Sequence, residues 1–211
     1  MKPIVGITMG DPAGIGPEVV VKSLNKPEIY DLCRPLVIGD RTRMELTVAG
    51  MKLPLQVAVA PHVPDARFEY GTIDVLQATT GDLRDVPYGR VSAAAGKAAV
   101  ECVFKGIELA LAGEIHAIAT APLNKEAMQL AGYNYPGHTE LLAEKTGTDL
   151  YSLMLVAGKL RVIHVTTHVS MRQALELIKR DRVLRMIRLA DRTCRELGIV
   201  EPRVAVAGLN C

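Results

Sequence analysis

Short apolar stretches alternate with helix-like ones along the first 120 residues. The apolar stretches are rich in β-branched residues, as expected of buried strands, and occupy residues 3–9, 34–39, 55–60 and 115–120. Helical spacing or an Ala-rich composition marks the intervening residues 18–25, 40–49 and 91–112. This alternation predicts an α/β fold with a mixed, largely parallel sheet and flanking helices.

The pattern changes twice further along the chain. In residues 61–90 Gly and Pro recur, which predicts a surface excursion with one short strand at 73–76. Two β-rich runs, 151–157 and 160–166, are joined only at Gly158 and Lys159. That link is too short for a parallel crossover, so these runs predict an antiparallel hairpin, which makes the sheet mixed.

A two-faced helix and a final strand are predicted near the end of the chain. On a helical wheel, one face carries Val183, Leu184, Ile187, Ala190, Cys194 and Leu197. The opposite face carries Arg185, Arg188, Arg192 and Arg195, either as a solvated surface or as a site for an acidic partner. The last strand is expected at residues 203–207. The sequence stops four residues after this strand. Because α/β sheets bind ligands at the carboxyl ends of their strands, the loop and helix that would follow this strand in such a site are missing, and we expect this polypeptide to be truncated.

Composition narrows the class of protein. The 211 residues are 49% hydrophobic and 23% charged, which is typical of a folded globular chain. A formal charge of +2 argues against nucleic-acid binding, so we expect a small ligand. Asp11 interrupts the N-terminal apolar run, so no signal peptide or membrane span is expected. The four cysteines form no CxxC pair, which argues against a disulfide framework or a zinc site and fits a protein of the reducing cytoplasm; they are Cys33, Cys102, Cys194 and Cys211.

Three motifs could carry chemistry at the ends of predicted elements. Residues 9–18 read MGDPAGIGPE, a Gly-rich turn that is either structural or anion-binding, with Asp11 as a polar contact at the sheet edge. The APLNKE motif places Asn124 and Lys125 at a helix start, where the cation either holds a phosphate or carboxylate or is only solvated. The YPGHTE motif offers His138 and Thr139 to a ligand; alternatively, Thr139 is an N-cap beside an exposed His138.

Two histidines invite a metal hypothesis. His164 and His168 are four residues apart, but on a strand that spacing separates them by about 13 Å. They cannot share one ion, because zinc–nitrogen bonds are only about 2 Å long. We expect His164 to be a satisfied sheet residue. His168 lies past the strand and before the expected N-cap Ser170, where a ligand would sit, so its partners in a metal site would be distant in sequence.

Together and in this order, the segments GDPAGIGPE, APLNKE, YPGHTE, VTTH and AGLN resemble the PdxA family. This family comprises NAD-dependent 4-hydroxythreonine-4-phosphate dehydrogenases and the related 4-phospho-D-threonate and 4-phospho-D-erythronate dehydrogenases. The resemblance implies a two-domain α/β fold similar to isocitrate and isopropylmalate dehydrogenases, of which residues 1–211 are the N-terminal part. It also implies a cytoplasmic homodimer, a small phosphorylated substrate, NAD and a divalent metal (Zn, Mg or Co).

Three of the family's functional residues carry over by position. His138 and Thr139 would contact the phosphorylated substrate. We expect Asp11 and Asn124 to bind the substrate as well, and Lys125 to be catalytic. His168 would be a metal ligand, whereas two further histidine ligands and the nucleotide contacts would lie beyond residue 211. The implied reaction is oxidation with decarboxylation of a four-carbon phosphorylated hydroxy acid. We expect these 211 residues alone to be inactive; the alternative function is a phosphate-binding module without turnover.

Overall fold

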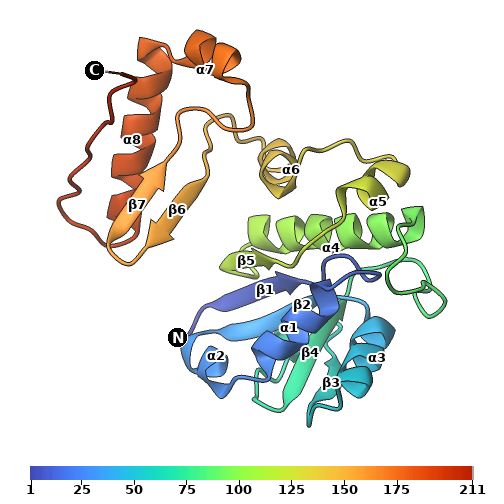
Figure 1. The fold of residues 1–211 in the computed structure, drawn as a ribbon. Helices are drawn as coiled ribbons and strands as arrows, with labels where there is room; N and C mark the ends of the chain where they lie inside the picture. The colour runs from blue at the N-terminus through green and yellow to red at the C-terminus, as the bar shows by residue number, and fades with distance from the viewer. Residues whose placement is uncertain (211) are drawn as a thin grey trace. The chain divides into compact units, whose positions relative to one another are not determined.

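A computed structural model describes residues 1–210, which divide into two compact units, residues 1–146 and 147–210. The first unit contains a five-stranded parallel sheet in the order β3-β4-β2-β1-β5. Figure 1 shows this sheet in blue to green. Its strands are β1 (Ile4–Thr8), β2 (Arg34–Gly39), β3 (Gln56–Val59), β4 (Thr72–Gln77) and β5 (Ala117–Thr120). The predicted α/β fold with flanking helices is confirmed.

Helices cover both faces of this sheet, as Figure 1 shows. Helix α4 packs on β1, β2 and β5 on one face, while α1 and α3 pack together on the other. Crossovers between parallel strands are normally right-handed, so helices formed before and after a reversal of the strand order lie on opposite faces. In this sheet the order reverses after β3. The helices of this unit are α1 (Gly16–Leu24), α2 (Pro27–Leu32), α3 (Arg41–Met51), α4 (Ala93–Leu111), α5 (Lys125–Leu130) and α6 (His138–Lys145), with a 3-10 turn at Val63–Asp65.

Side-chain caps explain where three of these helices begin. The Oδ1 atoms of Asp40 and Asn124 accept hydrogen bonds from the third amide of α3 and α5, respectively. Ser92 does the same for α4 through its hydroxyl. Each cap satisfies an amide that has no partner within the helix. Helix α2 was not predicted, because six residues are too few to show a periodicity.

The segment of residues 61–90 differs from its prediction. Its strand, β4, lies inside the sheet between β3 and β2, and residues 73–76 are all buried. The location at the surface was therefore wrong, although a strand does form. The reason is that only a short 3-10 turn follows β3, and the chain then returns into the gap beside β2. Hydrophobic periodicity alone does not reveal such a return.

A second, smaller core holds α5 and α6 against α4. It consists of Val100, Val103, Ile107, Met128 and Leu141. Gly96 lets α5 approach α4 closely, because a Cβ atom at this position would overlap the carbonyl group of Ala127. Within the described residues, no helix is long and apolar enough to cross a membrane.

The second unit contains the predicted hairpin, β6 (Met154–Ala157) and β7 (Leu160–Ile163), followed by α7 (Met171–Leu177) and α8 (Arg180–Glu196). The hairpin is antiparallel, as predicted, but among the described residues it forms a two-stranded sheet of its own. Ser170 caps α7 and exchanges hydrogen bonds with Gln173, so the predicted N-cap is confirmed.

Two predictions for this unit require correction. No strand forms at residues 203–207, because in the described chain no neighbouring strand pairs with this segment and its Val204 and Val206 are exposed. Helix α8 is two-faced as predicted. Its buried residues, however, are Met186 and Leu189, and neither is among the six residues of the predicted apolar face. All four arginines of the predicted basic face are exposed, and two form ion pairs, Arg192 with Glu196 and Arg195 with Asp191.

Candidate active site

The loops that follow β1 and β5 meet at one edge of the sheet. The two strands are parallel neighbours, so both loops leave from the same carboxyl edge. The chain after β1 continues into α1 on one face, whereas the chain after β5 continues into α5, which packs on α4 at the other face. This divergence is a topological switch point, where open α/β sheets bind ligands.

The Gly-rich loop of residues 10–16 is closed by its own hydrogen bonds. Asp11 is buried, and its Oδ1 accepts from the amide of Ala13 at 2.8 Å. Its backbone carbonyl accepts from Gly14 (3.1 Å), and its amide donates to the carbonyl of Pro122 (2.9 Å). Three loop amides are thus already used within the protein, which favours the structural reading of this turn. A substrate contact by Asp11 stays a prediction.

The loop after β5 contacts the Gly-rich loop through Pro122 and leads into Asn124 and Lys125. Asn124 Oδ1 is engaged as the cap of α5, with Ala127 as donor at 3.0 Å. Lys125 is exposed, and no ion pair of its ammonium group is found in the described part of the chain. Its charge is therefore available to an anionic ligand at this edge of the sheet. The catalytic role assigned to Lys125 stays a prediction.

His138 and Thr139 are the first two residues of α6, and the N-cap is Gly137. The reading of Thr139 as an N-cap is therefore wrong, because the helix begins two residues earlier than that reading requires. His138 is half-buried, and its Nε2 is shielded from solvent and has no hydrogen-bond partner in the described part of the chain. Burial lowers the pKa of His138, so the neutral imidazole is favoured. Thr139 is exposed.

Helix α6 is held in place by contacts of its middle and last residues. Leu141 is fully buried in the smaller core, and Lys145 lies over the ring of Phe104 at 4.9 Å. The Tyr135 hydroxyl donates to Glu144 at 2.8 Å, joining the YPGHTE motif to the end of its own helix. These contacts hold the start of α6 in a defined position relative to α4.

His168 lies in the second unit, between β7 and α7. It is exposed and has a positive φ of 55°, which is uncommon for a residue with a side chain. In residues 1–210, no three His, Cys, Asp or Glu side chains gather in a way that could hold a metal ion. The residues described here therefore do not form a complete metal site. A metal ligand role for His168 stays a prediction.

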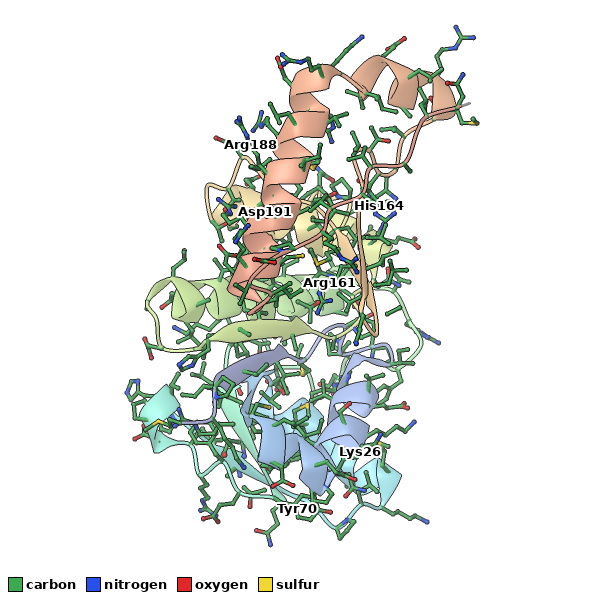
Figure 2. The ribbon with its side chains drawn as sticks, turned by 90° about the vertical axis from the view of Figure 1, so that its left-hand side faces the viewer. Lys26, Tyr70, Arg161, His164, Arg188 and Asp191 are labelled. Atoms are coloured by element: carbon green, nitrogen blue, oxygen red, sulfur yellow. The ribbon has the colours of Figure 1, made fainter. Side chains whose placement is uncertain are left out.

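His164 does not match its prediction. It lies just beyond β7, and its Nδ1 is buried and finds no hydrogen-bond partner among the residues that the structure describes. Arg161 on β7 likewise has a buried Nε without a partner; Figure 2 labels both residues in the second unit. The expectation of a satisfied sheet residue was wrong, because β7 ends one residue earlier and leaves this imidazole without a sheet environment.

Sequence reasoning missed a polar network at the ends of β2 and β4. Asp40 Oδ2 accepts from Gln77 Nε2 and from the Thr79 hydroxyl, both at 2.9 Å. The position of Asp40 directly after a predicted strand was a usable signal. Arg43 is also buried near this edge, but nothing in the sequence pattern of α3 marks it as different from the exposed Arg41.

The chain matches a family model, curated relatives and solved structures. The family model described as pyridoxal phosphate biosynthetic protein PdxA matches residues 31–211. The D-threonate 4-phosphate dehydrogenase of Cupriavidus necator is 47% identical over 99% of this chain and 62% of the relative. A crystal structure of a 4-hydroxythreonine-4-phosphate dehydrogenase from Burkholderia phymatum has a TM-score of 0.91 at 47% identity, covering 100% of this chain and 63% of that one.

A second solved structure agrees. The 4-hydroxythreonine-4-phosphate dehydrogenase from Klebsiella pneumoniae has a TM-score of 0.92 at 42% identity, covering 99% of this chain and 64% of that one. The chain thus spans less than two thirds of the length of these relatives. Because the family model covers most of the chain and the relatives align along nearly all of it, this chain belongs to the PdxA family.

Proposed function

We propose that this chain is part of an NAD-dependent, metal-dependent dehydrogenase that acts on a four-carbon phosphorylated hydroxy acid. The candidates are 4-phospho-D-threonate, 4-phospho-D-erythronate and 4-hydroxy-L-threonine 4-phosphate. The names of the relatives support this substrate class. In the structure, the supporting observation is the start of α6, where the buried Nε2 of His138 has no hydrogen-bond partner among residues 1–210. A cytoplasmic homodimer is part of the same proposal.

The proposed reaction has two steps. The carbon that bears the secondary hydroxyl gives a hydride to NAD, and the hydroxyl proton is released. The resulting β-keto acid loses its carboxylate as CO2, and the enolate that remains takes up a proton. His138 and Thr139 would bind the phosphorylated substrate. Lys125 would supply positive charge beside it, which stabilises oxygen anions as they form.

Metal and NAD enter this proposal from the family resemblance. His168 is the residue of this chain proposed to bind the metal, and an imidazole suits zinc or cobalt. The described residues do not complete a ligand set, so no step is assigned to the ion. Metal content of a longer chain carrying the C-terminal part of its relatives tests this role: His168→Ala is expected to lower bound metal, and unchanged content would refute the assignment.

The test of activity compares substrates in that longer chain. We expect metal-dependent NADH formation with at least one of the three phosphorylated acids. His138→Asn is expected to weaken substrate binding, because it removes the unpartnered Nε2. His62→Asn is a matched control, since His62 is exposed at the start of the 3-10 turn. No NADH with any of the three acids would refute the proposed reaction.

The rival function is phosphate binding without turnover. We propose that the 211-residue chain binds a phosphorylated acid weakly and produces no NADH, because its described residues, 1–210, offer substrate contacts without a complete metal site. Calorimetric titration with 4-phospho-D-threonate, together with an NADH assay at saturating metal, tests this. Turnover comparable to the longer chain would contradict it. Binding without turnover in the longer chain as well would favour the rival.

A further inference from the structure

Residues 79–90, which we call the strap, connect β4 to α4 and are tied down at both ends. At the start, the Thr79 hydroxyl donates to Asp40 (2.9 Å) and the Thr80 hydroxyl donates to Glu101 (2.7 Å). Near the end, the amide of Gly89 donates to the carbonyl of Ala13 at 2.7 Å. The strap therefore reaches from the polar network after β2 to the Gly-rich loop after β1.

The middle of the strap is held by Arg43 of α3. Its guanidinium donates from Nη2 to the carbonyls of Leu83 and Val86, the latter at 2.7 Å. The same group lies 4.5 Å from the ring centroid of Tyr88. Leu83 and Val86 turn their side chains into the main core. One side chain thus contacts the strap at three places along its length.

Stability alone does not account for an arginine here. Arg43 is 1% exposed, and no carboxylate forms an ion pair with it among residues 1–210. Its Nε is also buried and has no hydrogen-bond partner within this described range. A buried cation without a counter-charge is costly, so an apolar side chain would fill the space at less cost if bulk alone were needed. What the guanidinium adds is a fixed pair of donors for two strap carbonyls.

The strap leads directly to the candidate site. The amide of Gly89 donates a hydrogen bond to Ala13 in the Gly-rich loop, and the amide of Ala13 donates to Asp11. The amide of Asp11 donates in turn to Pro122, three residues before Lys125. We propose that Arg43 is a positioning residue: by holding the strap, it holds the Gly-rich loop and the loop before α5 in the arrangement that binds substrate. The part concerning substrate rests on the proposed dehydrogenase function.

Hydrogen exchange on this chain tests the positioning itself, without any activity. Arg43→Met removes both donors, and we expect amides of residues 79–90 and of the Gly-rich loop to exchange at least about tenfold faster. Arg43→Lys keeps the positive charge and N–H donors but lacks the rigid, planar guanidinium, so its rates are expected to lie between those of Arg43→Met and wild type. If Arg43→Met does not fold, the exchange rates of Arg43→Lys provide the test. Arg41→Met is the control, because Arg41 is exposed on the same helix and pairs with Glu45. Exchange in the strap of the Arg43 variants equal to that of Arg41→Met would overturn the proposal.

Kinetics of the longer chain test the consequence for substrate. We expect Arg43→Met to raise KM for the phosphorylated acid about tenfold while kcat changes less than about twofold. A fall in kcat at unchanged KM would overturn the link to substrate binding. Absence of turnover in wild type would refute the proposed function instead, and the exchange rates would still decide whether Arg43 positions the strap.

Discussion

Gly96 in α4 lies directly against the carbonyl group of Ala127 in α5, closer than any side chain would allow. This contact sets the position of α5, and therefore of Asn124 and Lys125 at its start. We expect Gly96→Ala to lower the free energy of unfolding by about 2–3 kcal/mol, because backbone on backbone cannot yield. Chemical denaturation measures this change.

Gly50 is the matched control for that substitution. It is also a helical glycine, in α3, but no atom lies within 4 Å of the position its Cβ would take. Gly50→Ala is therefore expected to stabilise the protein by about 0.5–1 kcal/mol, as alanine does in helices. Equal effects of the two substitutions would contradict the role of Gly96 in helix packing.

Gly10 is expected to be intolerant of any side chain. Its φ is +74°, and a Cβ atom would overlap the carbonyl of Pro122 and lie 3.0 Å from the Cβ of Ala121. Gly10→Ala is expected to destabilise the first unit by about 2 kcal/mol or more, from backbone strain and overlap together. Thermal unfolding checks this. Gly113→Ala separates the two causes, because Gly113 has a similar φ of +73° with open space around it.

His138 makes stability depend on pH in a defined direction. Because burial lowers the pKa of His138, the unfolded chain takes up a proton at a higher pH than the folded chain. Stability from this group is complete above about pH 6.5 and is lost as the pH falls through the folded pKa. His138→Gln is expected to flatten the dependence between pH 7.5 and 5 in urea titrations. The exposed His62→Gln variant is expected to retain it.

Cys102 is expected to be inert toward thiol reagents in the folded protein. It is fully buried in α4, and burial raises the pKa of Cys102 to about 12. Thiolate is the reactive form, so native labelling at pH 8 is expected to spare Cys102 and to reach it only after unfolding. Half-buried Cys33 is the internal comparison. Peptide mapping by mass spectrometry reads both sites, and rapid native labelling of Cys102 would contradict the buried position.

The sequence by itself determined the elements whose signals are local. The strand at residues 34–39 was predicted with its observed bounds, and the hairpin followed from the short link at Gly158 and Lys159. The cap of α7 at Ser170 was also predicted. These features depend on periodicity, turn length and capping, all of which involve residues within a few positions of one another.

The motifs of the candidate site were likewise visible in the sequence, but their environments were not. Asp11 is hydrogen-bonded within its own turn. For residues 1–210, no ion pair of Lys125 and no hydrogen-bond partner of the buried His138 Nε2 is found. Each of these states depends on which distant segment lies alongside. Pro122, for example, contacts the Gly-rich loop from more than a hundred residues away.

Only the tertiary structure decided the order of the strands, the interior place of β4 and the burial of Arg43. Arg41 and Arg43 stand two residues apart on the same helix, yet one is exposed and the other is covered by the strap. The strand predicted at residues 203–207 does not form, since a strand needs a partner as well as a pattern. Pairing and burial arise from contacts between segments far apart in the chain, and a local pattern carries no record of them.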